Sequence, residues 1–350
     1  MLLKRKGALP AEQIKALHKR SSIKCLRPLM NNQIQPASMD LRLSKKCWEV
    51  EASFLPGHKK TVRQKLSKLK KREIDIGDFK TLVKGKIYII QIQEELSLPG
   101  NISAIANAKS STGRLDILTR LISDNSSCFD RVIKGYKGPL YAEIAPNSFS
   151  VFAKENIKLN QIRFKLDHSQ IINQNKLNKS SFKPKNFSIN LKYNNNYIIG
   201  YRAKPHTDLI DLSKINYYKI EDYWEKIIPN NYQIVLDPGA FYILSSREFV
   251  SIAPNQAAEM APYLPLIGEF RVHYAGFFDP GFGYSSDNTQ KSRAVLEVRC
   301  HDTPFILEHG QNMGQLIFEN MLEEPDLIYG KKLKSNYQGQ GLKLSKHFKA

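Results

Sequence analysis

Lys109, Ser110, Ser111 and Arg114 lie within six residues and combine hydroxyl groups with cations, which together can hold a phosphate group. The segment 109–114 reads KSSTGR, and the pattern around it predicts the start of a helical turn. The first N–H groups of a helix have no partner within it and attract anions. Arg114 follows Ser110 by one turn, so its guanidinium can reach the same anion. The alternative is an ordinary serine cap beside a surface arginine.

Two glutamates, Glu143 and Glu297, each stand among apolar residues in a strand-like segment (YAEI and VLEV). Apolar surroundings raise the pKa of a carboxyl group, and proton transfer near neutral pH needs such a pKa. Both glutamates are therefore candidate catalytic residues. The alternative is a strand residue that faces solvent.

The sequence repeats itself at a nearly constant offset. Residues 141–164 align with residues 295–318 at an offset of 154 without a gap, which places Glu143 on Glu297. Farther upstream the offset is 155. Weak identity in a constant register indicates that a folded unit was duplicated.

The two copies differ at the phosphate-binding segment. In the second copy Pro265 and Leu266 replace the two serines, and Glu269 replaces Arg114. This exchange removes hydrogen-bond donors and reverses a charge, whereas a purely structural cap would more often be replaced by another cap. We infer that the first half binds phosphate and the second half does not.

The composition is typical of a folded protein with two domains. The chain has 350 residues, of which 41% are hydrophobic and 10% aromatic. The cysteines (Cys25, Cys47, Cys128 and Cys300) show no metal-ligand spacing, which favours reduced thiols in a cytoplasmic protein. No apolar run reaches membrane-spanning length, and the N-terminus lacks an apolar signal core, so we expect no membrane partner.

The formal net charge of +20 raises the question of a nucleic-acid partner. Much of the excess lies in two runs, 58–72 and 176–185, and neither interleaves aromatic residues as a base-stacking surface would. We interpret both runs as solvated loops and do not expect nucleic-acid binding. A positive field would still attract a small polyanionic substrate.

Short β segments separated by Gly, Pro and Asn dominate the sequence and predict a barrel or sandwich in each half. A short helix is expected over 10–19, and strands over 87–93, 149–151 and 305–307. Leu115, Leu118 and Leu121 at three-residue steps predict that the turn after Lys109 is helical. The predicted divisions are an N-terminal half over 1–167, a linker over 168–190 and a C-terminal half over 191–350.

Five segments, in this order, resemble motifs of the dCTP deaminase and trimeric dUTPase superfamily, and the resemblance is closest to the two-domain dCTP deaminases. The first is 34–43, and the phosphate segment 109–114 is the second, with Lys109 where the family usually has Arg. The others are the hairpin 275–282 (AGFFDPGF), the segment 313–318 with Gln315, and the tail from Tyr329 through Tyr337 and Gln340.

The resemblance implies a mainly β fold: a distorted jelly-roll β-barrel in each half, dUTPase-like, with a few short helices. It also implies a trimer-based homo-oligomer with active sites between barrels. The implied reaction is the hydrolytic deamination of dCTP to dUTP and ammonia, which supplies thymidylate synthesis. This reaction would need no zinc, in keeping with the lack of the His/Cys signature of zinc deaminases.

The resemblance further implies roles for individual residues. A strand glutamate, Glu297 or Glu143, would shuttle the proton. Lys109, Ser110, Ser111 and Arg114 would hold the triphosphate with Mg²⁺, with no metal site built from protein residues alone. The other substrate-binding residues implied by the resemblance are Asp279, Gln315, Tyr329, Tyr337 and Gln340.

This chain departs from the family pattern in ways that leave the site assignment open. The hairpin is lengthened by residues 284–292, and Asn336 stands where the family usually has Lys, a role that Lys334 could take. One hypothesis is a composite site that joins the phosphate segment to the hairpin and Glu297 of a C-terminal half. The other is a site within N-terminal halves around Glu143.

Two further functions fit the same sequence. The first is a dUTPase, or a bifunctional enzyme that also releases pyrophosphate from the nucleotide. The second is a non-catalytic barrel that binds nucleotides or nucleic acid, suggested by the basic excess.

Overall fold

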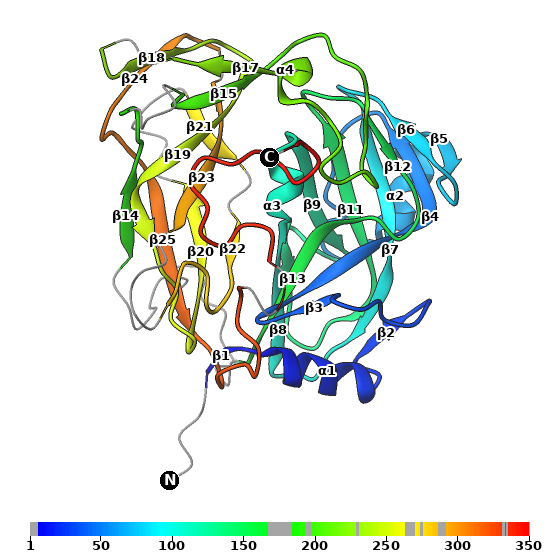
Figure 1. Cartoon of the computed structure of the whole chain (residues 1–350). Coiled ribbons are helices and arrows are strands. Elements are labelled where there is room, and N and C mark those ends of the chain that lie inside the picture. Colours follow the sequence, from blue (N-terminus) through cyan, green and yellow to red (C-terminus); the bar gives the residue numbers. More distant parts are fainter. Residues whose placement is uncertain are drawn as a thin grey trace.

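The computed structural model describes residues 6–166, 184–192, 198–228, 231–262, 270–273, 276–285, 292–300, 302–330, 333 and 335–349. Strands dominate both halves of the chain, and the described helices are short, as predicted. In Figure 1 the two halves lie side by side, and the C-terminal tail runs between them. No helix of the described residues is long and apolar enough to cross a membrane.

The N-terminal half is built on one sheet of 11 strands that bends around its core in the order β10-β8-β13-β4-β7-β11-β9, with β1, β2, β3 and β5 attached. A small sheet of β6, β12 and β16 packs beside it. The strands of this half are β1 (Gly7–Ala8), β2 (Ile23–Cys25), β3 (Ile34–Gln35), β4 (Ser38–Val50), β5 (Lys70–Asp75), β6 (Lys80–Leu82), β7 (Ile87–Ser97), β8 (Ile102–Ala108), β9 (Ile117–Ser123), β10 (Arg131–Val132), β11 (Lys137–Pro146), β12 (Val151–Ala153) and β13 (Lys158–Leu166).

The C-terminal half consists of the sheets β14-β25-β20-β22, β17-β15-β19-β23-β21 and β18-β24. Its strands are β14 (Lys185–Ser188), β15 (Gly200–Ala203), β16 (Ile210–Asp211), β17 (Trp224–Ile227), β18 (Gln233–Leu236), β19 (Phe241–Val250), β20 (Gln256–Pro262), β21 (Phe270–His273), β22 (Phe277–Phe278), β23 (Ser292–Cys300), β24 (Phe305–Glu308) and β25 (Asn312–Asn320).

The strand orders of the two halves confirm the duplication seen in the sequence. The order β5-β4-β7-β11-β9 recurs as β17-β15-β19-β23-β21, and β10-β8-β13-β4 recurs as β22-β20-β25-β14. In the first half β4 is one continuous strand that belongs to both layers, whereas the second half uses β14 and β15 for the same two places. β14 pairs with β25, so the C-terminal sheets already begin inside the segment predicted as a linker.

The helices are α1 (Ala11–Lys19), α2 (Val62–Leu69), α3 (Ser110–Gly113) and α4 (Ile220–Tyr223). The helix predicted near residue 10 is α1, which buries Ile14 and Leu17. The helical turn predicted after Lys109 is α3, but it is a single turn, and Leu118 and Leu121, whose spacing was interpreted as helical, lie in β9. Asp116, with φ of +55°, takes the chain out of the helical conformation.

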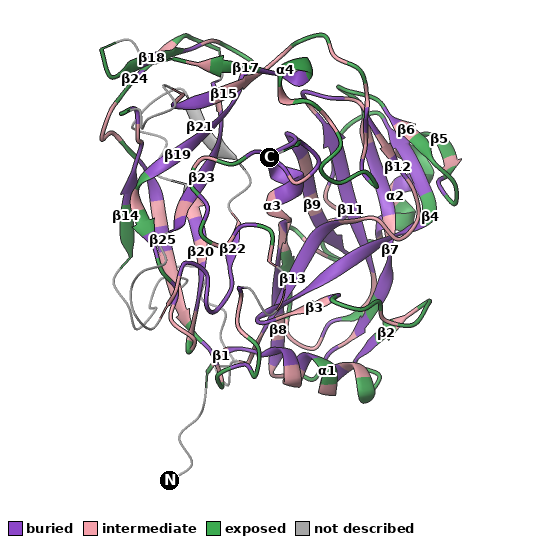
Figure 2. Ribbon diagram, viewed as in Figure 1, coloured by how far each residue is buried: buried purple, intermediate pink, exposed green. Residues whose placement is uncertain are grey.

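The two halves share part of their hydrophobic core. Phe149 of the N-terminal half packs edge-on against Trp224 (5.4 Å between ring centroids) and Tyr223 (5.9 Å). Phe348, from the C-terminal tail, joins the same aromatic cluster. Figure 2 shows buried residues in α3 and in the strands on both sides of it. The region between the halves is therefore packed, and α3 lies within it.

Candidate active site

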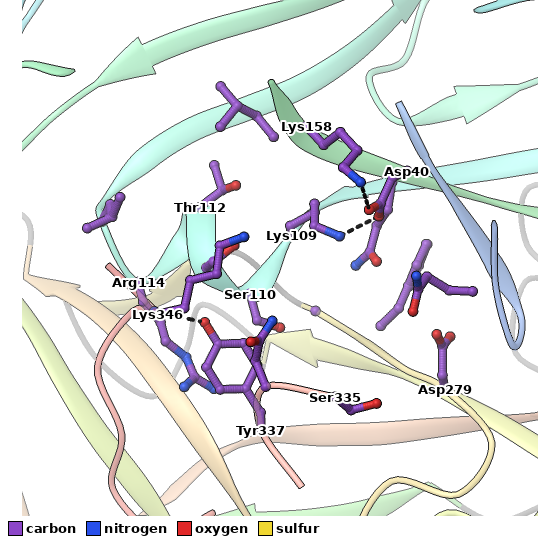
Figure 3. A pocket seen from close by; sticks show the side chains of 18 of the residues that line it. Asp40, Lys109, Ser110, Thr112, Arg114, Lys158, Asp279, Ser335, Tyr337 and Lys346 are labelled. Carbon is purple, nitrogen blue, oxygen red and sulfur yellow. Dashed lines mark hydrogen bonds and ion pairs between the residues drawn. The ribbon is translucent and has the colours of Figure 1, made fainter. Parts of the chain in front are cut away.

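A cavity of about 610 Å³ is lined by residues of both halves. It contains nine of the eleven side chains that the sequence predicted for substrate binding or catalysis, and Figure 3 shows part of it from close by. The predicted residues in its lining are Lys109, Ser110, Ser111, Arg114, Asp279, Glu297, Tyr329, Tyr337 and Gln340.

The hydroxyl groups come from α3, which β8 leads into and β9 follows. The carbonyl of Lys109 accepts the N–H groups of Thr112 (2.8 Å) and Gly113 (3.0 Å), which closes the turn. The N–H groups of Ser110 and Ser111 begin the turn and have no partner within it. The Ser110, Ser111 and Thr112 hydroxyls donate to no other described residue, so they are available to a ligand that enters the cavity.

Arg114 connects this turn to the C-terminal half. It is buried, and its guanidinium donates to Gln340 Oε1 (3.0 Å) and to the carbonyl of Lys343 (2.9 Å). The ring of Tyr337 lies flat against it, with 3.9 Å from Cζ to the ring centroid. The tail residues Tyr337 and Gln340 therefore close over the phosphate segment of the same chain.

Glu297 projects from β23, whose neighbours are β19 and β21. Only 3% of its surface is exposed, and its carboxylate oxygen lies 3.7 Å from Nε of Arg114. Burial raises the pKa of Glu297 to about 8, although the charge of Arg114 opposes the shift. Because a carboxyl group with this pKa gains and loses a proton near neutral pH, Glu297 is suited to general acid–base chemistry.

The hairpin residue Asp279 is held by an arginine of the other half. Arg163, in β13, is fully buried and donates to Asp279 Oδ1 (3.0 Å), to the carbonyl of Phe278 (3.2 Å) and to Glu319 (2.9 Å). Burial raises the pKa of Asp279, an effect that Arg163 opposes. Arg163 thus fixes the hairpin against the half that carries the hydroxyl groups.

A glycine lets the hairpin lie close to the tail. Gly281 has φ of +93°, and a Cβ atom there would be 2.8 Å from the carbonyl oxygen of Tyr329. The N–H of Tyr329 donates to the carbonyl of Pro280 (2.7 Å). No other residue type would fit this contact without a shift of the backbone.

Lysines and a carboxylate line the remaining polar part of the cavity. Asp40, in β4, forms ion pairs with Lys109 and with Lys158 (3.6 Å), and Figure 3 shows both pairs. Lys346, from the tail, lies on the same side of the cavity. The sequence analysis did not select these lining residues except Lys109, although Asp40 lies within the first of the five motifs.

Two predicted site residues lie elsewhere. Glu143, in β11, is buried and pairs with Arg120 (2.5 and 3.0 Å), outside this cavity. Gln315 is not among the cavity residues, whereas Gln161, its counterpart in the first half, is. The offset of the duplication could have drawn attention to Gln161. The placement favours the composite hypothesis, and the roles of the individual residues remain predictions.

Some residues of the sequence argument lie outside the described residues. They are Pro265, Leu266, Glu269 and Lys334, together with residues 286–291 of the lengthened hairpin. Among the described residues, no group of three or more His, Cys, Asp or Glu side chains is arranged to hold a metal ion.

Comparison with known proteins places this site in context. The sequence model of the 2'-deoxycytidine 5'-triphosphate deaminase (DCD) N-terminal domain matches residues 5–198, and that of the C-terminal domain matches residues 145–348. The crystal structure of 2'-deoxycytidine 5'-triphosphate deaminase from Agrobacterium tumefaciens superimposes with a TM-score of 0.83. It is 44% identical and covers 91% of this chain and 99% of that one.

Curated relatives match a smaller part. A protein of Methanocaldococcus jannaschii named "dCTP deaminase, dUMP-forming" is 30% identical over 129 residues, which are 36% of this chain and 54% of the relative. A protein of the same name from Methanococcus maripaludis strain C6 is 38% identical over 124 residues, 35% of this chain and 53% of the relative. The chain spans about half the length of these relatives.

Proposed function

The chain belongs to the dCTP deaminase family, and from this premise we propose that the cavity between its halves binds dCTP and replaces the amino group of the cytosine ring by oxygen. The observation that carries the proposal is the position of Glu297. It is a buried carboxyl group with a raised pKa, in contact with the arginine of a hydroxyl-rich turn. An acid–base group for the ring and donors for the phosphates thus meet in one cavity.

In the proposed reaction Glu297 acts on water. Its carboxylate accepts a proton as the water oxygen bonds to C4 of the ring, and the proton passes to the ring nitrogen N3. Glu297 then moves the proton of the new C4 hydroxyl group to the amino nitrogen, the C4–N bond breaks as the C4=O bond forms, and ammonia leaves. The sum is dCTP and water converted to dUTP and ammonia. Arg114 positions the carboxyl group and stabilises its charged form.

Glu143 is a weaker candidate for this role. Arg120 holds it in an ion pair, and the Phe129 ring covers one face of the guanidinium, with 3.7 Å from Cζ to the ring centroid. No hydroxyl-rich turn faces it among the described residues. The carboxylate of Glu143 is engaged in this pair, whereas that of Glu297 lies beside the arginine of the hydroxyl-rich turn.

The residues fit a triphosphate that arrives with Mg²⁺. Magnesium takes most of its ligands from phosphate oxygens and water and needs one or two carboxylates at most. Asp40 and Asp279 both line the cavity and could provide one. When bound, the ion would neutralise part of the triphosphate charge. Ser110, Ser111, Arg114 and the lysines would hold the rest of the phosphate oxygens.

The product could also be dUMP, because the curated relatives carry the name "dUMP-forming". A bifunctional enzyme would use the same phosphate site and would also release pyrophosphate. Separating the products after incubation with dCTP and Mg²⁺ distinguishes the two reactions. The deaminase proposal predicts dUTP; dUMP with pyrophosphate supports the bifunctional alternative, and unchanged dCTP contradicts both.

The two glutamates allow a matched test of the site. We expect Glu297→Gln to reduce kcat by at least about 100-fold, because general acid–base catalysis typically contributes this much. Glu143→Gln should keep kcat within about threefold but lower the stability, since it breaks a buried ion pair. Steady-state kinetics and thermal unfolding of both variants provide the measurement. Loss of activity in Glu143→Gln alone would overturn the assignment.

The proposal also excludes zinc from the chemistry, which a chelator can test. Deamination in excess Mg²⁺ should be unchanged by 1,10-phenanthroline, which removes zinc but binds magnesium poorly. EDTA in excess over Mg²⁺ should abolish the activity, because the triphosphate would lose its counter-ion. Inactivation by phenanthroline that added Zn²⁺ reverses would contradict the mechanism. A trimer-based assembly and a cytoplasmic location remain predictions.

A further inference from the structure

The segment after Gln340 is fixed firmly beneath the hydroxyl-rich turn. Asn216 donates its N–H to the carbonyl of Lys346 (2.9 Å), and Tyr217 donates to that of His347 (2.9 Å). The ring of Phe348 packs among aromatic residues of the C-terminal half. The backbone on both sides of Lys346 therefore has a defined position.

The same segment is bonded to the turn itself. The Ser345 hydroxyl donates to the carbonyl of Ser111 (2.7 Å), and the N–H of Lys346 contacts the Tyr337 hydroxyl (3.3 Å). In Figure 3 the Lys346 side chain extends from the Tyr337 hydroxyl towards α3. Lys346 thus lines the same cavity as Asp40 of β4 and Lys158 of β13.

The charge of Lys346 has no partner among the described residues. Lys109 and Lys158 both pair with Asp40, whereas the ammonium group of Lys346 makes no ion pair or hydrogen bond there. Burial lowers the pKa of Lys346, and the charges of Lys109 and Lys158 add to the effect, against Asp40. A cation held where its charge is unfavourable is typical of a group that awaits an anionic ligand.

The charged groups that act on the pKa of Lys346 belong to one part of the cavity. They are Lys109, Asp40 and Lys158, and neither Glu297 nor Asp279 is among them. The main charge near Glu297 is that of Arg114. Lys346 therefore belongs, with Lys109, Asp40 and Lys158, to the part of the cavity that is lined by lysines.

Building on the proposed function, we propose that Lys346 binds the outer phosphates of the substrate and makes the enzyme select a nucleoside triphosphate over a monophosphate. The hydroxyl groups of α3 and the ammonium group of Lys346 would hold the phosphate chain together. No change in the fold is needed, because the tail is already docked.

Binding of inorganic tripolyphosphate and of dCTP to the full chain, measured by calorimetry, tests the proposal. Lys346→Met should weaken the binding of both ligands about tenfold or more, since a charge-assisted contact is lost. The KM for dCTP should rise by a similar factor while kcat changes less than about threefold. Lys346→Arg should retain most of the affinity. Lys349→Met is the matched control, because Lys349 lies on the same segment with an exposed side chain, and it should behave as wild type.

Thermal unfolding separates this role from a structural one. Without ligand, Lys346→Met should be as stable as wild type or more stable, because it removes an unpaired, partly buried charge. A fall in stability would contradict the proposal, and so would unchanged tripolyphosphate binding. If wild type binds tripolyphosphate through Lys346 but does not deaminate dCTP, the phosphate contact is supported and the proposed reaction is refuted. If wild type binds neither tripolyphosphate nor dCTP, the phosphate contact and the proposed reaction are both refuted.

Discussion

Glu143 and Glu297 occupy equivalent positions of the duplicated sequence, but the residues opposite them differ. In the first half Arg120 of β9 stands opposite Glu143, and in the second half His273 of β21 stands opposite Glu297. The arginine pairs with its glutamate, whereas Glu297 has its charged neighbour, Arg114, in the other half. Glu143 thus has its charged partner on the next strand of its own half, whereas the charged neighbour of Glu297 comes from the other half.

The raised pKa of Glu297 predicts a pH dependence. The proposed reaction needs its carboxylate form, and the unliganded group is mostly protonated below its pKa of about 8. We therefore expect kcat/KM to rise with pH and to level off above about pH 8. Steady-state kinetics from about pH 6 to about pH 9.5 would check this. Glu143→Gln should show the same profile, and a kcat/KM that falls over this range would refute the assignment of Glu297 as the base.

The elements of the site are short, and tertiary contacts rather than helix length position them. α3 is a single turn, so its dipole is small and the anion site depends on the hydroxyls and cations around it. The hairpin with Asp279 depends on Arg163 of β13, which reaches from the other half. One buried side chain therefore holds the hairpin against the half that carries α3.

Arg163 should act as a positioning residue. Arg163→Lys cannot keep all of its five hydrogen bonds, so Asp279 and the Phe278 carbonyl lose their fixed place. We expect KM for dCTP to rise about tenfold or more, with a smaller change in kcat, because the affected hairpin binds rather than reacts. Lys165→Met, on the same strand and bonded to the same Glu319, is the control and should leave KM unchanged. Equal effects of both variants would refute the role of Arg163.

The sequence allowed the fold class and most of the site to be predicted, for identifiable reasons. The residues of the hydroxyl-rich segment are adjacent in the sequence, so Ser110 and Arg114 could be predicted as site residues from the sequence alone. The helical turn was predicted correctly, but the leucine spacing used to support it was misleading, because the left-handed residue Asp116 ends the turn and Leu118 and Leu121 lie in the strand that follows. Arg163 and Lys346 were not predicted as site residues because only contacts between the two halves bring them to the cavity or its hairpin.

At the scale of the whole molecule, one chain supplies both parts of the candidate site. The hydroxyl groups come from α3 and the candidate catalytic acid from β23, and Arg114 touches residues of the tail of its own chain. The half without the phosphate motif thus contributes side chains to the cavity beside that motif. Among the described residues, Glu143 is paired with Arg120 and does not line this cavity, so we do not propose a second site around it.

Mixing two inactive variants tests whether the site lies within one chain. Arg114→Glu and Glu297→Gln damage different halves, and each should be inactive. If every site is built within one chain, unfolding and refolding the two together should restore no activity, because each chain carries one defect. Sites shared between chains would regain up to about a quarter of the wild-type activity by random pairing. Recovery of that size would refute the intramolecular site. Each variant refolded alone is the control.

The cavity residues are far apart along the chain, so the ribosome makes them at different times. Asp40 leaves the ribosome long before Lys346, by about 15–60 s at usual elongation speeds. The N-terminal barrel can fold during that interval, with its hydroxyl groups in place but no acid or tail beside them. Nascent chains should therefore be inert towards nucleotides until translation passes the last residues of the cavity.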